Sequence, residues 1–163
     1  MSRGLNIRTY DYVNQPFEKV KGALSGDPRS VFQAATKTAA ERANSLAAEL
    51  SIDVGGVKLG ADISISVKEI THHRAEGGGG PSTVIHLEWE AANRQHLFPF
   101  MRAELSIYPL TATETQLDFS GVYEPPLGLL GSAMNAVVGH RIAESSVHRF
   151  IVAVAEHLRT SLK

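Results

Sequence analysis

The sequence predicts an α+β fold in which an antiparallel β-sheet is covered by one long C-terminal helix. Residues 83–92, 101–109 and 115–123 each alternate apolar and polar side chains, which is typical of strands with one buried and one wet face. After Pro125 and Pro126, residues 132–162 carry apolar side chains at helical spacing. The 163 residues lie in the size range of one domain, so we expect a single domain over residues 1–163.

The N-terminal part predicts one strand and two short helices. Leu5 to Val13 is rich in Ile, Tyr, Thr and Val and is expected to be a strand. Pro16 then opens a helix over Phe17 to Leu24, whose apolar residues recur at helical spacing. Asp27-Pro28 starts the second helix, because Asp is a good N-cap and Pro suits the first helical position. We place the change from this helix to strand periodicity near Asn44.

Two hairpins are expected in the middle of the chain. Strand periodicity runs from Leu46 to Val54 and continues from Val57 to Ile70, with Gly55-Gly56 between them as the turn. Residues 72–81 are expected to be a loop that leads to the next strand, and His72 and His73 fall in this loop. Together with the three alternating segments, this predicts a sheet of about six to seven strands.

The C-terminal helix is expected to run from Ser132 to Leu162. About 30 helical residues span roughly 45 Å, so this helix must lie across the sheet. Its predicted inner stripe consists of Val147, Ile151, Val154 and Leu158, extended upstream by Val137, His140 and Ala143.

Composition excludes several classes of function. The 16 basic and 17 acidic residues give a formal charge of −1, without the concentrated positive field that nucleic acid or anionic lipid requires. The absence of cysteine excludes disulfides and thiolate chemistry and suits a reducing cytosol, so we expect a cytoplasmic location. No run of about 18 apolar residues occurs, so we expect no membrane insertion, and residues 1–10 lack a signal-peptide pattern.

The order of elements resembles the START-like superfamily, also called SRPBCC or helix-grip proteins. The stretches that carry the resemblance are Leu87 to Ala91, Leu97 to Leu105, Gly121 to Gly128 and Gly139 to Glu144. The resemblance extends from about Leu5 to Leu162 and is to a bacterial branch related to polyketide cyclases and lipid-transport proteins. It implies a cavity between the sheet and the long helix, of about 300–1,000 Å³, for a lipophilic small molecule.

The same resemblance implies which side chains line that cavity. The ligand-binding candidates are Trp89, Met101, Leu105, Phe119, Tyr123, Val137, His140 and Arg141. The wider apolar face adds Ile63, Ile65, Ile85, Leu87, Ala103 and Leu117. Sequence patterns alone do not separate the lining of a cavity from a filled core. Trp89 and Tyr123 are favoured as ligand contacts, because each has a polar end that needs a partner.

Polar groups on the long helix have two interpretations. In one, Arg141 holds a carboxylate or enolate oxygen of the ligand at the cavity mouth. In the favoured one, Arg141 pairs with Glu144, three residues further along the helix. Glu88 and Glu90 alternate with apolar neighbours and are expected to face water. The seven histidines show no His-x-x-x-His pattern, so we expect no metal, and nothing in the sequence implies a cofactor.

Three functions stay open. Non-catalytic binding of a lipid or a polyketide-like molecule is favoured, because the apolar sheet face has few titratable groups. An enzyme of the polyketide cyclase or dehydratase class requires His140, Arg141 and Tyr123 to converge in the cavity. A protein-interaction module predicts a closed pocket and an exposed apolar patch instead. The sequence does not predict the oligomeric state.

Overall fold

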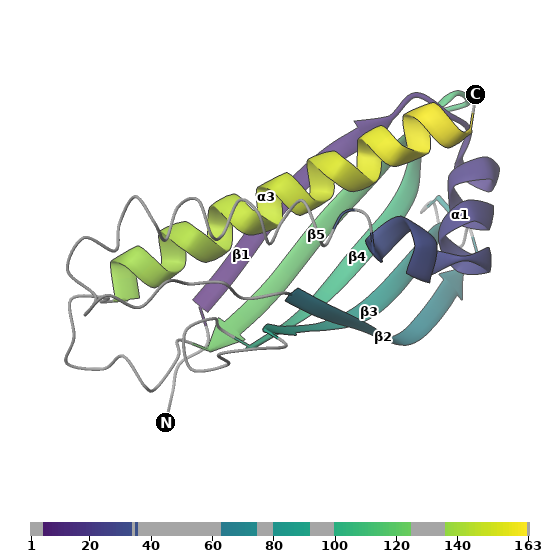
Figure 1. The fold of residues 1–163 in the computed structure, drawn as a ribbon. Helices are drawn as coiled ribbons and strands as arrows, with labels where there is room; N and C mark the ends of the chain where they lie inside the picture. The colour runs from purple at the N-terminus through teal and green to yellow at the C-terminus, as the bar shows by residue number, and fades with distance from the viewer. Residues whose placement is uncertain are drawn as a thin grey trace.

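The computed structural model describes residues 5–33, 35, 63–74, 80–91, 100–124 and 136–162. The described elements are β1 (Leu5–Val13), α1 (Phe17–Gly26), β2 (Ile63–His73), β3 (Ser82–Ala91), β4 (Phe100–Thr111), β5 (Glu114–Glu124) and α3 (Ala136–Ser161). The predicted α+β class and the arrangement of sheet and long helix are confirmed. Figure 1 shows α3 lying lengthwise over one side of a twisted sheet, with α1 beside the C-terminal end of α3.

The N-terminal elements form where the sequence predicts them. β1 has the predicted bounds, and α1 begins directly after Pro16 and buries Phe17, Val20 and Leu24. Residues 28–33 and 35 are also helical. Asp27 is the N-cap of this segment, because its Oδ1 accepts a hydrogen bond from the backbone N–H of Ser30 at 3.3 Å.

Several expectations lie outside the described residues. They are the change from helix to strand near Asn44, the strand from Leu46 to Val54, the Gly55-Gly56 turn, the start of the next strand at Val57 and the first residues of the long helix, from Ser132. The described sheet therefore has five strands, against the six to seven expected for the whole chain.

The five described strands pair antiparallel in the order β1-β5-β4-β3-β2. Consecutive strands from β2 to β5 are neighbours, and β1 joins the sheet by pairing with β5. The predicted alternation in β3, β4 and β5 is confirmed, since Ile85, Leu105 and Phe119 on the inner face are all fully buried. The inner face is the one that α3 covers.

The prediction for the end of β2 is wrong. His72 and His73 are the last two residues of this strand and not part of a loop. They pair with Thr83 and Ser82 on β3, and His72 Nδ1 lies 2.9 Å from Thr83 Oγ1. Pairing with β3 extends the strand beyond the point where its own hydrophobic pattern ends.

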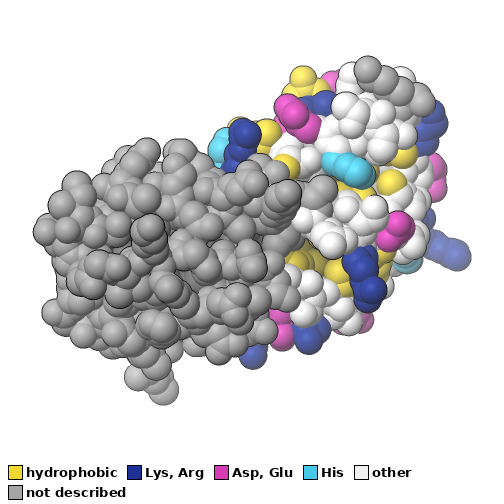
Figure 2. Space-filling view, viewed as in Figure 1, with side chains coloured by type: hydrophobic (Ala, Val, Ile, Leu, Met, Phe, Trp, Pro, Cys, Tyr) yellow, Lys and Arg dark blue, Asp and Glu magenta, His cyan; other side chains and the backbone are white. Residues whose placement is uncertain are grey.

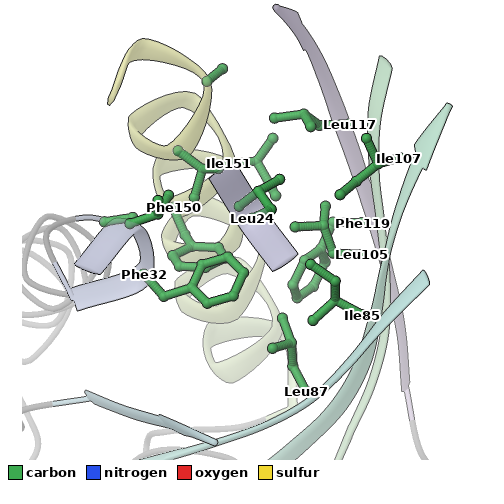
Figure 3. Close-up of a cluster of buried hydrophobic side chains, with 14 of the residues drawn as sticks. Leu24, Phe32, Ile85, Leu87, Leu105, Ile107, Leu117, Phe119, Phe150 and Ile151 are labelled. Carbon is green, nitrogen blue, oxygen red and sulfur yellow. The ribbon is translucent and has the colours of Figure 1, made fainter. Parts of the chain in front are cut away.

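The long helix buries the downstream part of the predicted stripe, and the side chains of its upstream extension, Val137, His140 and Ala143, lie outside the described part of the structure. Val147, Ile151, Val154 and Leu158 are at most 1% exposed, and Phe150 and Ala155 join them in the core. α3 packs mainly against β1. Figure 3 shows Phe150 and Ile151 of α3 pointing toward Phe119 and Leu105 of the sheet, with Phe32 beside them.

Candidate functional site

Strand pairing brings three of the predicted site residues into one row across the sheet. Trp89 on β3 pairs with Met101 on β4, and Met101 pairs with Tyr123 on β5. The row continues to Ile65 on β2 and Leu5 on β1. These five residues lie far apart in the sequence, and only the register of the strands makes them neighbours. We call them the Met101 row.

The next row along the inner face contains the smallest side chains of the sheet. Ala103 on β4 pairs with Gly121 on β5, and Leu87 and Ile7 flank them. A Cβ atom added to Gly121 would lie 2.7 Å from Met101 Sδ and 3.2 Å from Phe119 Cε1. The Met101 side chain therefore occupies the space that Gly121 leaves open, and it is only 2% exposed.

The third row is a packed core. It contains Leu105 and Phe119, two of the predicted ligand contacts, and both are fully buried. The Phe119 ring meets Phe150 of α3 edge-on at 6.1 Å between centroids, and the centroids of the Phe32 and Phe150 rings lie 5.8 Å apart. This part of the sheet–helix interface is filled by protein side chains (Figure 3). Leu105 and Phe119 are therefore part of a filled core in this row.

The helix backbone brings its predicted site residues to that same end. Thr9 Oγ1 on β1 lies 3.2 Å from His148 Nδ1 on α3. Leu5 lies about 13 Å before Thr9 along the strand, and His140 lies about 12 Å before His148 along the helix. Since α3 runs beside β1 in the same direction (Figure 1), the backbone at His140 comes level with Leu5 and the Met101 row.

Val137 and Arg141 lie within one helical turn of His140, so they share this position along α3. The side chains of Trp89, Tyr123, Val137, His140 and Arg141 lie outside the described part of the structure. The role of these five residues in binding, and the convergence of His140, Arg141 and Tyr123, therefore stay predictions.

The outer face of the sheet has a hollow of about 640 Å³. It is lined by Lys68, His86, Leu87, Glu88, Arg102, Ala103, Glu104, Ser120 and Val122. Its charges are balanced, and two pairs are close: Lys68 Nζ to Glu88 Oε2 at 3.5 Å, and His86 Nδ1 to Glu104 Oε1 at 3.6 Å. Glu88 lies on this outer face, as predicted, and its side chain is 33% exposed. The Glu90 side chain lies outside the described part.

A further ion pair on the outer face joins β1 and β5. Arg8 Nη2 lies 2.8 Å from Asp118 Oδ2, and the Arg8 side chain is 73% exposed. The hydrogen bond to Asp118 raises the pKa of Arg8 above its ordinary value. The pair is a surface contact between strands.

The exposed large apolar side chains of the described part lie on four strands. Tyr10 and Tyr12 lie on β1, Val67 on β2, Leu110 on β4 and Val122 on β5. On the face seen in Figure 2, Lys and Arg are interspersed with Asp and Glu over the described residues. Among these residues no group of His, Asp and Glu could hold a metal ion, and no described helix is long and apolar enough to cross a membrane.

Sequence reasoning missed three residues that shape this region. Gly121 is predicted as part of an alternating strand and of a stretch that carries the resemblance, but not as a site residue, although a glycine at an inward position marks a close approach of other atoms. Thr9 and His148, which fix the level of α3 against β1, had no pattern of their own in the sequence.

Comparisons with known proteins identify the fold. No family model matches the sequence, and no curated protein matches it. A conserved protein from Geobacillus kaustophilus has a similar structure, with 15% identity over 96% of this chain and 97% of that chain and a TM-score of 0.50. The Zhui aromatase/cyclase from Streptomyces sp. R1128 has 12% identity over 98% and 96% of the two chains and a TM-score of 0.49.

Norcoclaurine synthase from Thalictrum flavum has 8% identity over 96% of this chain and 87% of its own, with a TM-score of 0.48. At these identities the likeness concerns the fold alone. The fold is the helix-grip arrangement of an antiparallel sheet and a long C-terminal helix, and the predicted resemblance is confirmed at that level.

Proposed function

We propose that this chain binds a lipophilic small molecule between the Met101 row and the N-terminal half of α3. One observation supports this most directly: Trp89, Met101 and Tyr123 are cross-strand neighbours at the end of the inner face that lies beyond the packed Phe119–Phe150 core. The ligand thus contacts two aromatic residues and one thioether, which suit an apolar molecule with a few polar groups.

The chemistry of the inner face favours binding over catalysis. The described side chains of the first three rows carry no titratable group, since they consist of aliphatic residues, Met101, Phe119 and the hydroxyl of Thr9. General acid–base catalysis requires such groups near the reacting atoms. Affinity for a lipid or a polyketide-like molecule then arises from apolar surface removed from water.

Trp89 provides a direct test because it is the only tryptophan in the chain. Titration with fatty acids, isoprenoids and aromatic polyketides is expected to change its fluorescence intensity and emission maximum. Native mass spectrometry of the purified protein, followed by extraction, is expected to identify a co-purifying lipophilic molecule. As a matched control, Val122→Ala on the outer face should bind as the wild type does. Unchanged fluorescence across the panel, with no extracted ligand, contradicts the proposal.

An enzyme of the polyketide cyclase class is the second candidate. It is supported by the position of the His140 backbone level with the row that contains Tyr123. His140→Ala and Tyr123→Phe should then abolish conversion of a poly-β-ketone substrate and leave binding largely intact. Binding without conversion by the wild-type protein rejects this candidate.

A further inference from the structure

We propose that Met101 is a displaceable plug over the Ala103–Gly121 pair, and that the site takes a ligand with an unbranched aliphatic tail whose end replaces the Met101 side chain there. This inference rests on the proposed function and adds the class of ligand. It is carried by contacts among described side chains on β4 and β5.

The first step is the shape of the sheet surface. Ala103 and Gly121 are direct partners on neighbouring strands, so two minimal side chains stand side by side on the inner face. Leu87 and Ile7, at 2% and 3% exposure, flank them in the same row. The result is a recess in the inner face, bounded on two sides by larger aliphatic side chains.

The second step is what fills the recess. Met101 lies on β4 in the adjacent row, yet its Sδ and Cγ lie 2.7 Å and 3.1 Å from the position of a Cβ on Gly121. The side chain therefore leans diagonally across to β5. Methionine is unbranched and flexible, so it fits a narrow gap and leaves it at low cost when another apolar group replaces it.

The third step concerns Phe119, the residue at the far end of the recess. Phe119 Cε1 lies 3.2 Å from the same position on Gly121, and the fully buried Phe119 ring is held edge-on against Phe150. The recess thus ends at a ring that is packed in the core. A blind recess about as wide as a methionine side chain admits a methylene chain, whereas a fused ring is too wide for it.

The test measures which length of aliphatic chain the protein binds most tightly, with Trp89 fluorescence as the readout. The probes are straight-chain alkanoates from hexanoate to hexadecanoate, with anilinonaphthalene sulfonate as a polycyclic probe. Met101→Ala removes the three side-chain atoms beyond Cβ that a tail has to displace, so the preference is expected to shift toward chains long enough to reach the recess. Long chains are expected to bind about tenfold more tightly. Gly121→Ala places a methyl group in the recess and is expected to shift the preference to shorter chains.

Two further variants separate an effect on ligand binding from an effect on folding. Met101→Leu conserves volume but is branched and stiffer, so it should retain wild-type stability in urea and lose tolerance for the longest chains. Val122→Ala, next to Gly121 on the outer face, should leave the preference unchanged. The methyl resonance of Met101, assigned by its loss in Met101→Leu, should shift when a long alkanoate binds to the wild type.

The outcomes separate this inference from the proposed function. If the wild type, Met101→Ala and Gly121→Ala share one chain-length preference, the plug is rejected and the binding function stands. If the polycyclic probe binds and no alkanoate does, the aliphatic class of ligand is rejected and the binding function stands. If no probe binds to the wild type or to any variant, both proposals fail.

Discussion

Arg159 of α3 and Asp11 of β1 form a half-buried ion pair, with Arg159 Nη2 2.9 Å from Asp11 Oδ1 and side-chain exposures of 28% and 19%. The same Arg159 nitrogen donates to the backbone carbonyl of Tyr12, and Asp11 Oδ1 accepts the Tyr12 backbone N–H at 2.7 Å. The Arg159 guanidinium also lies 5.3 Å from the centre of the Tyr12 ring.

These contacts attach the C-terminal end of α3 to β1, one of the two edge strands of the described sheet. They also satisfy both backbone polar groups of Tyr12 with side chains. Together with Thr9 and His148, they hold the helix in the position that brings His140 level with the Met101 row.

We expect Arg159→Ala to lower the free energy of unfolding by about 1–3 kcal/mol, because it leaves the Asp11 carboxylate and the Tyr12 carbonyl without this donor. Urea unfolding followed by circular dichroism measures the change. The matched control is Arg8→Ala, which removes an exposed Arg–Asp pair on the same strand and should have a smaller effect. Equal effects of the two substitutions would show that the contacts of Arg159 add nothing.

Two hydroxyl groups should respond in opposite directions. Ser25 Oγ is buried and has no hydrogen-bond partner in the described part of the structure. Thr115 Oγ1 donates to the Gln15 carbonyl at 2.8 Å from a fully buried residue. Ser25→Ala should leave stability unchanged or raise it by up to about 1 kcal/mol, whereas Thr115→Val should lower it by about 1–2 kcal/mol. Differential scanning calorimetry resolves both signs, and a destabilising Ser25→Ala would contradict this expectation.

A double-mutant cycle tests the contact between Met101 and Gly121 independently of any ligand. The methyl group of Gly121→Ala meets Met101 Sδ, so this substitution should cost about 1–2 kcal/mol in the wild-type background. In the Met101→Ala background the obstructing atoms are absent, so the cost of Gly121→Ala in free energy of unfolding should fall by about 1 kcal/mol. Chemical denaturation of the four proteins provides the coupling energy. Strict additivity would mean that Met101 does not occupy the space over Gly121.

Much of the fold could be predicted because it depends on local patterns. Alternation identified the inner faces of β3, β4 and β5, and Pro16 marked the start of α1. The four predicted stripe residues of α3 are all buried. These features follow from the periods of strand and helix, which a sequence displays directly.

Other features of the fold depended on how neighbouring strands pair. β2 has an irregularity between Val67 and Glu69, so Lys68 is an extra residue and Ile70 takes the inward position opposite Ile85. The same strand continues through His72 and His73, although its apolar alternation ends earlier. No property of the β2 sequence alone fixes where β3 begins to pair with it.

The sequence by itself determined the class of the fold, the faces of most strands and the buried stripe of the long helix, since each depends on spacing along one segment. The tertiary structure alone decided that Trp89, Met101 and Tyr123 form one row, because register is a relation between strands. It also decided that Leu105 and Phe119 belong to a filled core, because Phe150 of α3 packs against Phe119 and Phe32 packs in turn against Phe150. The position of Met101 over Gly121 is likewise a matter of packing between neighbouring strands, where atoms distant in sequence compete for the same space.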